Sequence, residues 1–180
     1  MATTVDQIAG YLKSNDLRHR IHEDRSVIVM GFASDHYVDT DGDKHIPVII
    51  ELEEDGEFIK IMVPYCYVCR EGPHKQALFQ ELLMLCWQTK MLQFEYDATD
   101  GEVRAIVEYP LEDAPLTERQ FMRSLMGLVS LIDKHDYMIR RALDSGVIEK
   151  PVDPEAIMDE FRQFMAQRKG RHAEGDEPAS

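Results

Sequence analysis

The sequence predicts an α+β fold in which helices pack on an antiparallel sheet. Segments that alternate apolar and polar residues, the pattern of half-buried strands, occur in pairs joined by short turns such as Asp100-Gly101. Stretches with apolar residues at helical spacing stand before, between and after these pairs. The predicted order is α-ββββ-α-ββ-α, followed by an extra C-terminal helix.

The first helix is predicted to begin at Thr4, which has the spacing of a capping box with Gln7. Apolar residues then recur at the spacing that puts them on one helix face, where they can meet a core. They are Val5, Ile8, Ala9 and Leu12. The polar run 14–16 is expected to end this helix.

Four strands are predicted next, over residues 17–22, 27–32, 48–53 and 58–63. The polar, turn-rich segment 34–44 is expected to be a loop between the second and third strands. Asp55-Gly56 predicts a hairpin turn because both residues tolerate a positive φ. Pro64 is expected to end the fourth strand because proline has no N–H for the ladder.

The second predicted helix, from His74 to about Lys90, is apolar around most of its circumference. Pro73 is expected at its first position, where the missing N–H costs nothing. A helix that packs on one sheet face needs only an apolar stripe, so this one needs a second cover. That cover is another helix of the chain or another subunit. The apolar residues are Ala77, Leu78, Phe79, Leu82, Leu83, Met84, Leu85, Cys86 and Trp87.

Residues 92–96 and 103–109 alternate on either side of an Asp-Gly turn and form the clearest hairpin in the sequence. A third helix is predicted to begin with a capping box at Thr117 and to run to about Asp144. Gly146 suits its C-terminal stop, because glycine readily adopts the left-handed conformation found there.

The predicted organisation is one α+β domain over 1–146, an appended helix over 147–169 and a disordered tail over 170–180. Asp153 as N-cap and Pro154 at the first helical position begin the appended helix. The tail is polar and carries no apolar periodicity.

The composition limits the classes of partner. The chain has 34 acidic and 20 basic side chains and a formal net charge of −14, so it lacks the basic stripe that nucleic acids require. Anionic membranes would repel it, and its longest nearly uncharged apolar run, Leu82–Trp87, is far too short to span a bilayer. Three cysteines and no apolar leader indicate free thiols in the cytoplasm.

The segment 94–104, with sequence FEYDATDGEVR, resembles the signature hairpin of the YbjN family of bacterial proteins. Its surroundings agree, since a helix ending in Leu82–Leu85 precedes it and Leu116-Thr117 opens a long helix after it. The resemblance covers roughly residues 4–143. It implies a fold similar to that of type III secretion chaperones, which are small, acidic and commonly dimeric. The implied function is a binding or regulatory module, often described as a sensory transduction regulator.

No arrangement of residues in the sequence predicts catalysis or a cofactor, so the chain is not expected to be an enzyme. The alternative is a small metal- or thiol-dependent protein that uses Cys66 and Cys69, with His74 as a third metal ligand. No second pair of ligands completes a tetrahedral site, which favours a structural role for these cysteines. His135-Asp136, on the third helix, is interpreted as a surface or partner contact.

The sequence therefore predicts a non-catalytic module that binds a protein or peptide partner and forms a homodimer. Surplus apolar surface on the second helix is expected at the subunit or partner face. The residues predicted there are Leu78, Leu82, Cys86 and Trp87, with Phe161, Phe164 and Met165 as a second patch on the appended helix.

Overall fold

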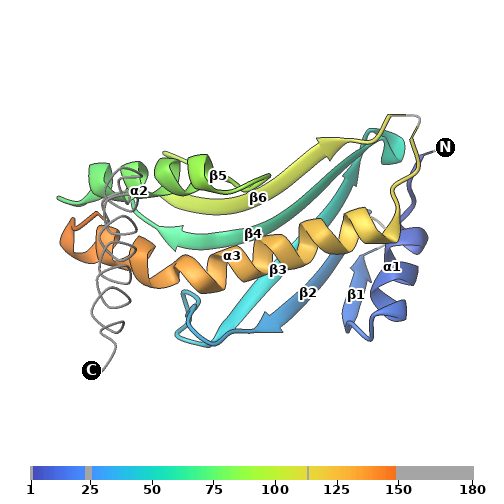
Figure 1. The fold of residues 1–180 in the computed structure, drawn as a ribbon, viewed down its shortest axis with the longest axis horizontal. Coiled ribbons are helices and arrows are strands. Elements are labelled where there is room, and N and C mark those ends of the chain that lie inside the picture. Colours follow the sequence, from blue (N-terminus) through green and yellow to red (C-terminus); the bar gives the residue numbers. More distant parts are fainter. Residues whose placement is uncertain (1, 23–25, 113, 149–180) are drawn as a thin grey trace, which may run out of the picture. The chain divides into compact units, whose positions relative to one another are not determined.

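A computed structural model describes residues 2–22, 26–112 and 114–148 (Figure 1). These residues form a six-stranded antiparallel sheet and three α-helices, which confirms the predicted α+β class and the order of its elements. The predicted appended helix lies, from residue 149 on, outside the described residues, as does the predicted tail 170–180.

The elements alternate between helices and antiparallel strands as predicted. In chain order they are α1 (Val5–Ser14), β1 (His19–His22), β2 (Val27–Ala33), β3 (His45–Glu53), the 3₁₀ turn η2 (Glu54–Gly56), β4 (Phe58–Val68), α2 (Lys75–Gln88), β5 (Gln93–Tyr96), β6 (Glu102–Pro110) and α3 (Glu118–Ser145). The strand order in the sheet is β1-β2-β3-β4-β6-β5, so β1 and β5 are its edges.

The core lies between one face of the sheet and the helices. Figure 1 shows α3 crossing this face, with α1 near one end of the helix and α2 near the other. Alternate residues of the central strands point into the core, and α3 contributes an apolar face at helical spacing. Fully buried members include Ile28, Ile50 and Ile61 of the sheet and Phe121, Leu125, Leu128 and Ile132 of α3.

The N-caps predicted at Thr4 and Thr117 are present, but only one is a complete capping box, and the N-cap predicted at Asp153 lies outside the described residues. At α3, Thr117 accepts from the Gln120 backbone N–H, and the Gln120 side chain accepts in return from the Thr117 N–H. At α1, Thr4 accepts from Gln7 N, but the Gln7 amide donates instead to the Tyr11 hydroxyl and to the Leu116 carbonyl. The predicted box at Thr4 is therefore half correct, because tertiary acceptors lie within reach of Gln7.

The prediction that Pro64 ends the fourth strand is wrong. β4 continues to Val68, and its register with β6 shifts between Val63 and Tyr67. Pro64 lies inside this bulge, where the chain leaves the ladder and no N–H is needed, and Tyr65 takes a positive φ of 46°.

The predicted start of the second helix is also displaced. α2 begins at Lys75 with His74 as its N-cap residue, and Pro73 lies in the turn before it. Proline therefore shapes the entry to α2 but does not occupy its first position.

Candidate functional site

The second helix has one face in the core and one face in solvent. Leu78 and Leu82, both predicted at a partner face, are 0% and 5% exposed and lie within the core of this chain. Trp87 is 90% exposed and Cys86 is half-buried. Leu83, which was not among the predicted contact residues, is 71% exposed. We call Leu83 and Trp87, which are one helical turn apart, the α2 stripe.

Helical periodicity explains this division. Leu78, Leu82 and Leu85 recur at the i, i+4, i+7 spacing of one helix face and are buried, and α2 packs against α3 on that side. Residues 83 and 87 fall on the opposite side. An all-round apolar helix cannot be divided in this way from sequence alone, because no polar face marks the outside. The predicted second patch, Phe161, Phe164 and Met165, lies outside the described residues.

A groove of about 220 Å³ runs between α2 and the edge strand β5, and we call it the apolar groove. The rings of Phe79 on α2 and Tyr96 on β5 have centroids 4.9 Å apart in an edge-on arrangement that joins its two walls. Its lining residues are Phe79, Leu82, Leu83, Cys86, Phe94, Glu95, Tyr96 and Val103.

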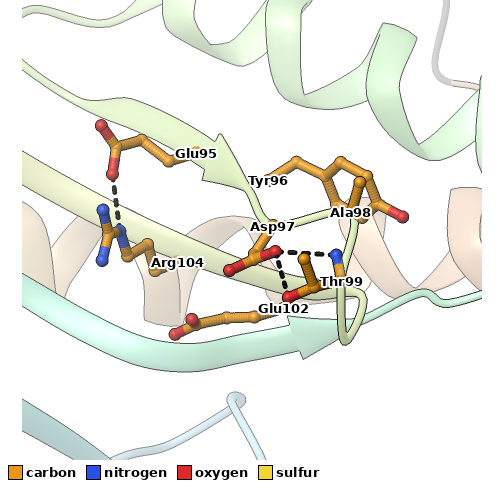
Figure 2. A pocket seen from close by; sticks show the side chains of 7 residues that line it. All are labelled: Glu95, Tyr96, Asp97, Ala98, Thr99, Glu102 and Arg104. Carbon is orange, nitrogen blue, oxygen red and sulfur yellow. Dashed lines mark hydrogen bonds and ion pairs between the residues drawn. The ribbon is translucent and has the colours of Figure 1, made fainter.

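A second concave region, of about 430 Å³, lies at the β5–β6 hairpin, and we call it the acidic pocket (Figure 2). Glu95 and Arg104 form an ion pair 2.5 Å long across the two strands. Asp97 accepts from the backbone N–H and the hydroxyl of Thr99, and these bonds lower the pKa of its carboxyl. The lining residues are Glu95, Tyr96, Asp97, Ala98, Thr99, Glu102 and Arg104.

The two concave regions share Glu95 and Tyr96 and therefore meet along β5. Phe94 and Tyr96 belong to the set of side chains packed against the core, whereas Glu95 pairs with Arg104 of the neighbouring strand. Adjacent residues of a strand point to opposite faces, so β5 has an apolar side toward α2 and a charged side away from it. The alternation in residues 92–96 predicts a strand with one apolar side. Only the strand order shows that this strand lies at the edge of the sheet.

The cysteine pair is buried. Cys66 and Cys69 are both core residues, and burial raises the pKa of the Cys66 thiol well above its ordinary value. Burial also raises the pKa of Cys86. Metal ligation and redox exchange need the thiolate, which burial disfavours at Cys66 and Cys86. His74 lies against Gly146, the residue that follows α3. A Cβ on Gly146 would lie 2.5 Å from Nδ1 of the His74 ring. No metal-binding cluster of three or more histidines, cysteines and carboxylates occurs among the described residues.

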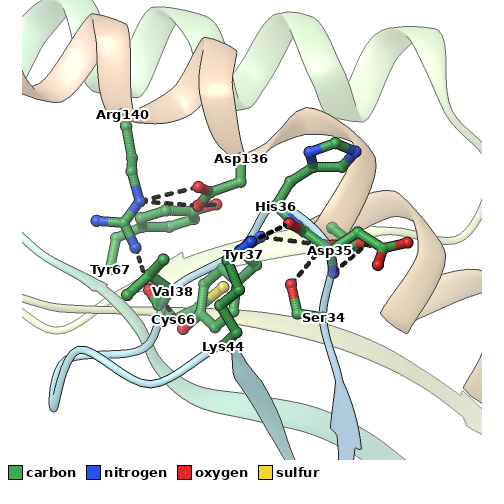
Figure 3. Close-up of polar contacts among 11 residues, drawn as sticks. Ser34, Asp35, His36, Tyr37, Val38, Lys44, Cys66, Tyr67, Asp136 and Arg140 are labelled. Carbon is green, nitrogen blue, oxygen red and sulfur yellow. Dashed lines mark hydrogen bonds and ion pairs between the residues drawn. The ribbon is translucent and has the colours of Figure 1, made fainter.

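A buried polar network joins the loop 34–44 and β4 to α3 (Figure 3). The hydroxyl of Tyr67 donates to Asp136 Oδ1 at 3.0 Å, and Arg140 Nε donates to both oxygens of the same carboxylate. Arg140 also donates to the carbonyl of Val38, and the Tyr37 hydroxyl donates to the Cys66 carbonyl. Burial raises the pKa of Asp136, and the Arg140 charge opposes that shift.

The interpretation of Asp136 as a surface or partner contact is wrong, because its side chain is buried inside this network. Its neighbour Asp133, one turn earlier on α3, anchors the same loop. Asp133 Oδ1 accepts from the Ser34 hydroxyl at 2.5 Å and from the Tyr37 backbone N–H at 3.0 Å. These polar groups are paired with one another, as is typical of a network that stabilises a fold.

None of the described helices is long and apolar enough to cross a membrane.

No model of a protein family matches the chain, and no curated protein matches its sequence. Solved structures do match its fold. The chain is similar to YbjN of E. coli, described as a putative transcription regulator, with 10% identity and a TM-score of 0.54 over 76% of this chain and 94% of that one. It is also similar to a chain of the ExsC–ExsE complex, with 16% identity and a TM-score of 0.52 over 77% and 97%.

A chain of the HopA1–SchA chaperone–effector complex matches at 14% identity and a TM-score of 0.46, over 68% of this chain and 84% of that one. At identities this low, the likeness concerns the fold alone. The described part of the chain has an α+β fold with a six-stranded antiparallel sheet and three helices, and it resembles YbjN and the type III secretion chaperones.

Proposed function

We propose that this chain is a non-catalytic, cytoplasmic module that binds another protein. The observation that carries the proposal is the α2 stripe, in which Trp87 is 90% exposed beside an exposed Leu83. Aromatic residues, tryptophan above all, dominate the energetics of protein interfaces because they bury a large rigid surface. The apolar groove adjoins this stripe and enlarges the apolar area that a partner could cover.

Two further observations support a binding role. The buried polar groups of the network around Asp136 are paired with one another, and burial raises the pKa of the Cys66 thiol, so neither serves a reaction readily. Among the proteins of similar fold, ExsC was solved in a complex with ExsE, which is an analogy at the level of the fold.

A photo-crosslinking residue placed at position 87, in the cell that makes this protein, tests the proposal. We expect crosslinked protein adducts from position 87 and none from position 20, whose native Arg20 is exposed on the edge strand β1. Mass spectrometry of the adducts identifies the partner and distinguishes a second copy of the chain from a different protein. The absence of adducts from position 87, or equal adducts from both positions, would overturn the proposal.

For the α2 stripe itself, we propose a second copy of the chain as the occupant, so that the module is a homodimer. An interface of standard size buries about 800 Å² on each partner, so the contact must extend beyond two side chains. Met91, which is exposed just beyond the end of α2, continues the apolar surface in the chain direction. Sedimentation of the wild type at micromolar concentration tests this part, and a monomer would contradict it.

A further inference from the structure

We infer that the outer face of α3 binds an acidic α-helix of another protein, whose carboxylates lie opposite a row of cations on α3. We call this surface the α3 cationic face. Its residues, all exposed, are Arg119, Arg123, Met126, Lys134, Tyr137 and Arg141. The inference goes beyond the proposed function, because it assigns a second binding surface, separate from the α2 stripe, and the chemical class of its partner.

The first step is the way in which α3 gathers its cations. Arg119, Arg123, Lys134 and Arg141 are separated by 4, 11 and 7 residues, which is close to one, three and two turns of a helix. The four side chains therefore lie on one side of α3, although no run of basic residues marks them in the sequence. The exposed residues from 119 to 141 include no carboxylate.

The second step is that these charges are available to a partner. Among the described residues, none of the four cations forms an ion pair or a side-chain hydrogen bond. Arg140 of the same helix differs, because it donates to both oxygens of Asp136 inside the fold. The row ends where Asp144 is exposed, one turn after the last cation. Carboxylates of a partner would complement the row.

The third step is the geometry of the face. It extends for about 33 Å along α3, at a rise of about 1.5 Å per residue. A helix packed alongside presents its side chains at the same pitch, so its carboxylates can meet successive cations. Met126 and Tyr137 lie about three turns apart on this face and are 43% and 69% exposed. The partner helix therefore needs apolar residues among its carboxylates, to contact these two side chains.

A wider polyanion fits this face less well. The loop 34–44 lies along one side of α3, where Asp133 accepts from the Ser34 hydroxyl and from the Tyr37 backbone N–H. A nucleic acid duplex or an anionic membrane would bring its phosphates toward the carboxylates of this loop as well as toward the cations. A single helix covers the row alone. The loop carboxylates are those of Asp35, Asp39, Asp41 and Asp43.

The described helices of a second copy do not complement the face. A second α3 would bring another row of cations, and like charges placed together at an interface oppose association. The single carboxylate of α1 is that of Asp6, and the single carboxylate of α2, that of Glu81, is buried. None of these three helices offers an acidic row, which favours a different protein as the partner.

The test uses the full-length protein and a fluorescent alanine-based helical peptide with glutamate and leucine along one face, with binding followed by anisotropy. At physiological ionic strength, charges more than about 8 Å apart are largely screened, so the local row outweighs the net charge of the chain. We expect saturable binding. Two control peptides should bind at least about tenfold more weakly, because each removes charge complementarity. One has glutamine for glutamate, and one spreads the same glutamates around the helix. Duplex DNA and phosphatidylserine vesicles serve as competitors.

A double variant locates the site. Arg123→Gln combined with Lys134→Gln is expected to weaken the probe about fivefold, because it removes two charge contacts. The matched control is Arg20→Gln combined with Lys90→Gln, which removes two exposed cations elsewhere. Arg20 lies on the face of the sheet away from α3, because its neighbour Ile21 packs against the core. The control should leave binding unchanged.

Further variants test the apolar contact and the sign of the charge. Tyr137→Ser should weaken the probe about threefold, because it removes an exposed aromatic contact. Trp87→Ser, which removes an exposed aromatic side chain from the α2 stripe, should leave binding unchanged. Arg123→Glu combined with Lys134→Glu should lose the glutamate probe and bind a lysine version of it, a gain that misfolding cannot produce.

The outcomes separate this inference from the proposed function. Failure of the probe to bind, equal losses in variants and controls, or displacement of the probe by DNA or vesicles at equal charge overturns the inference. A dimer whose mass falls in the Arg123, Lys134 double variant but not in Trp87→Ser assigns the face to a second copy and also overturns it. Adducts from position 87 without probe binding support the proposed function alone. Probe binding without those adducts supports the inference and overturns the proposal for the α2 stripe.

Discussion

The Tyr67 hydroxyl donates a 3.0 Å hydrogen bond to Oδ1 of Asp136, and this bond joins the end of β4 to the middle of α3 inside the core. The two residues are separated by 69 positions in sequence. Arg140, one turn after Asp136, completes the arrangement by donating to the same carboxylate. β4 continues past the bulge at Pro64 and Tyr65 and reaches Tyr67 beyond it.

We predict that Asp136→Leu destabilises the protein by about 1–3 kcal/mol, because it leaves a buried hydroxyl and a half-buried guanidinium without their acceptor. Asp136→Asn should cost less, since its amide oxygen still accepts one hydrogen bond. Urea unfolding followed by circular dichroism gives the free energies. An effect of Asp136→Leu no larger than that of Asp43→Asn would show that the network does not stabilise the fold.

A second prediction concerns the stability of the protein at low pH. Burial by itself would raise the pKa of Asp133, but hydrogen bonds from the Ser34 hydroxyl and from the backbone N–H groups of 35–37 outweigh it and lower the pKa below its ordinary value. A depressed pKa contributes stability that is present above the ordinary pKa and is lost as pH falls through the folded-state pKa. The difference in unfolding free energy between wild type and Asp133→Asn should therefore be constant near neutral pH and shrink below about pH 4.

Unfolding of both proteins over a pH series measures this difference, and Asp43→Asn serves as the control. A difference that grows as pH falls would contradict the assignment.

Gly56 provides a third prediction. It has a φ of 92° in the η2 turn, and a Cβ there would lie 2.1 Å from the Thr3 carbonyl oxygen. Gly56→Ala should destabilise the protein by about 1–3 kcal/mol from backbone strain, with the clash adding to it. Gly127→Ala, in α3, meets nothing within 4 Å and should stabilise by about 0.5–1 kcal/mol. Thermal unfolding of the two variants should therefore move in opposite directions.

Thiol accessibility provides a fourth prediction and tests the metal or thiol alternative. Cys86 is half-buried, whereas Cys66 and Cys69 are buried, so a thiol reagent should label Cys86 first and the other two only on unfolding. Protein purified without chelator should contain zinc well below stoichiometry, and Cys66→Ser with Cys69→Ser should not change its zinc content. Stoichiometric zinc, or rapid labelling of Cys66 in the folded protein, would revive the alternative.

A fifth prediction separates binding from folding at Trp87. Because its side chain is almost wholly in solvent, Trp87→Ser should change the unfolding free energy of the monomer by no more than about 0.5 kcal/mol. The same change should shift the sedimentation of the proposed dimer toward the monomer. Leu85→Ser is the contrasting control, since that buried side chain belongs to the core and its loss should destabilise the fold.

Local patterns predicted the elements well where one signal dominates. The capping box at Thr117, the glycine stop at Gly146 and the Asp100-Gly101 hairpin are all present, because each depends on neighbours in sequence. The predictions at Pro64 and Pro73 failed because a bulge and an extra turn give proline a place that a local rule does not anticipate. At Gln7 and Asp136, partners distant in sequence changed what the side chain does.

For the proposed binding surface, too, some features follow from the sequence and others only from the tertiary structure. The sequence by itself determined that the helix around residues 75–88 has more apolar surface than one sheet can cover, and that the chain is acidic. Only the tertiary structure decided that Leu78 and Leu82 are buried while Leu83 and Trp87 are exposed. The face of α2 that packs against α3 and the sheet is the buried one. It also decided that β5 is an edge, since strand order depends on contacts between residues far apart in the chain.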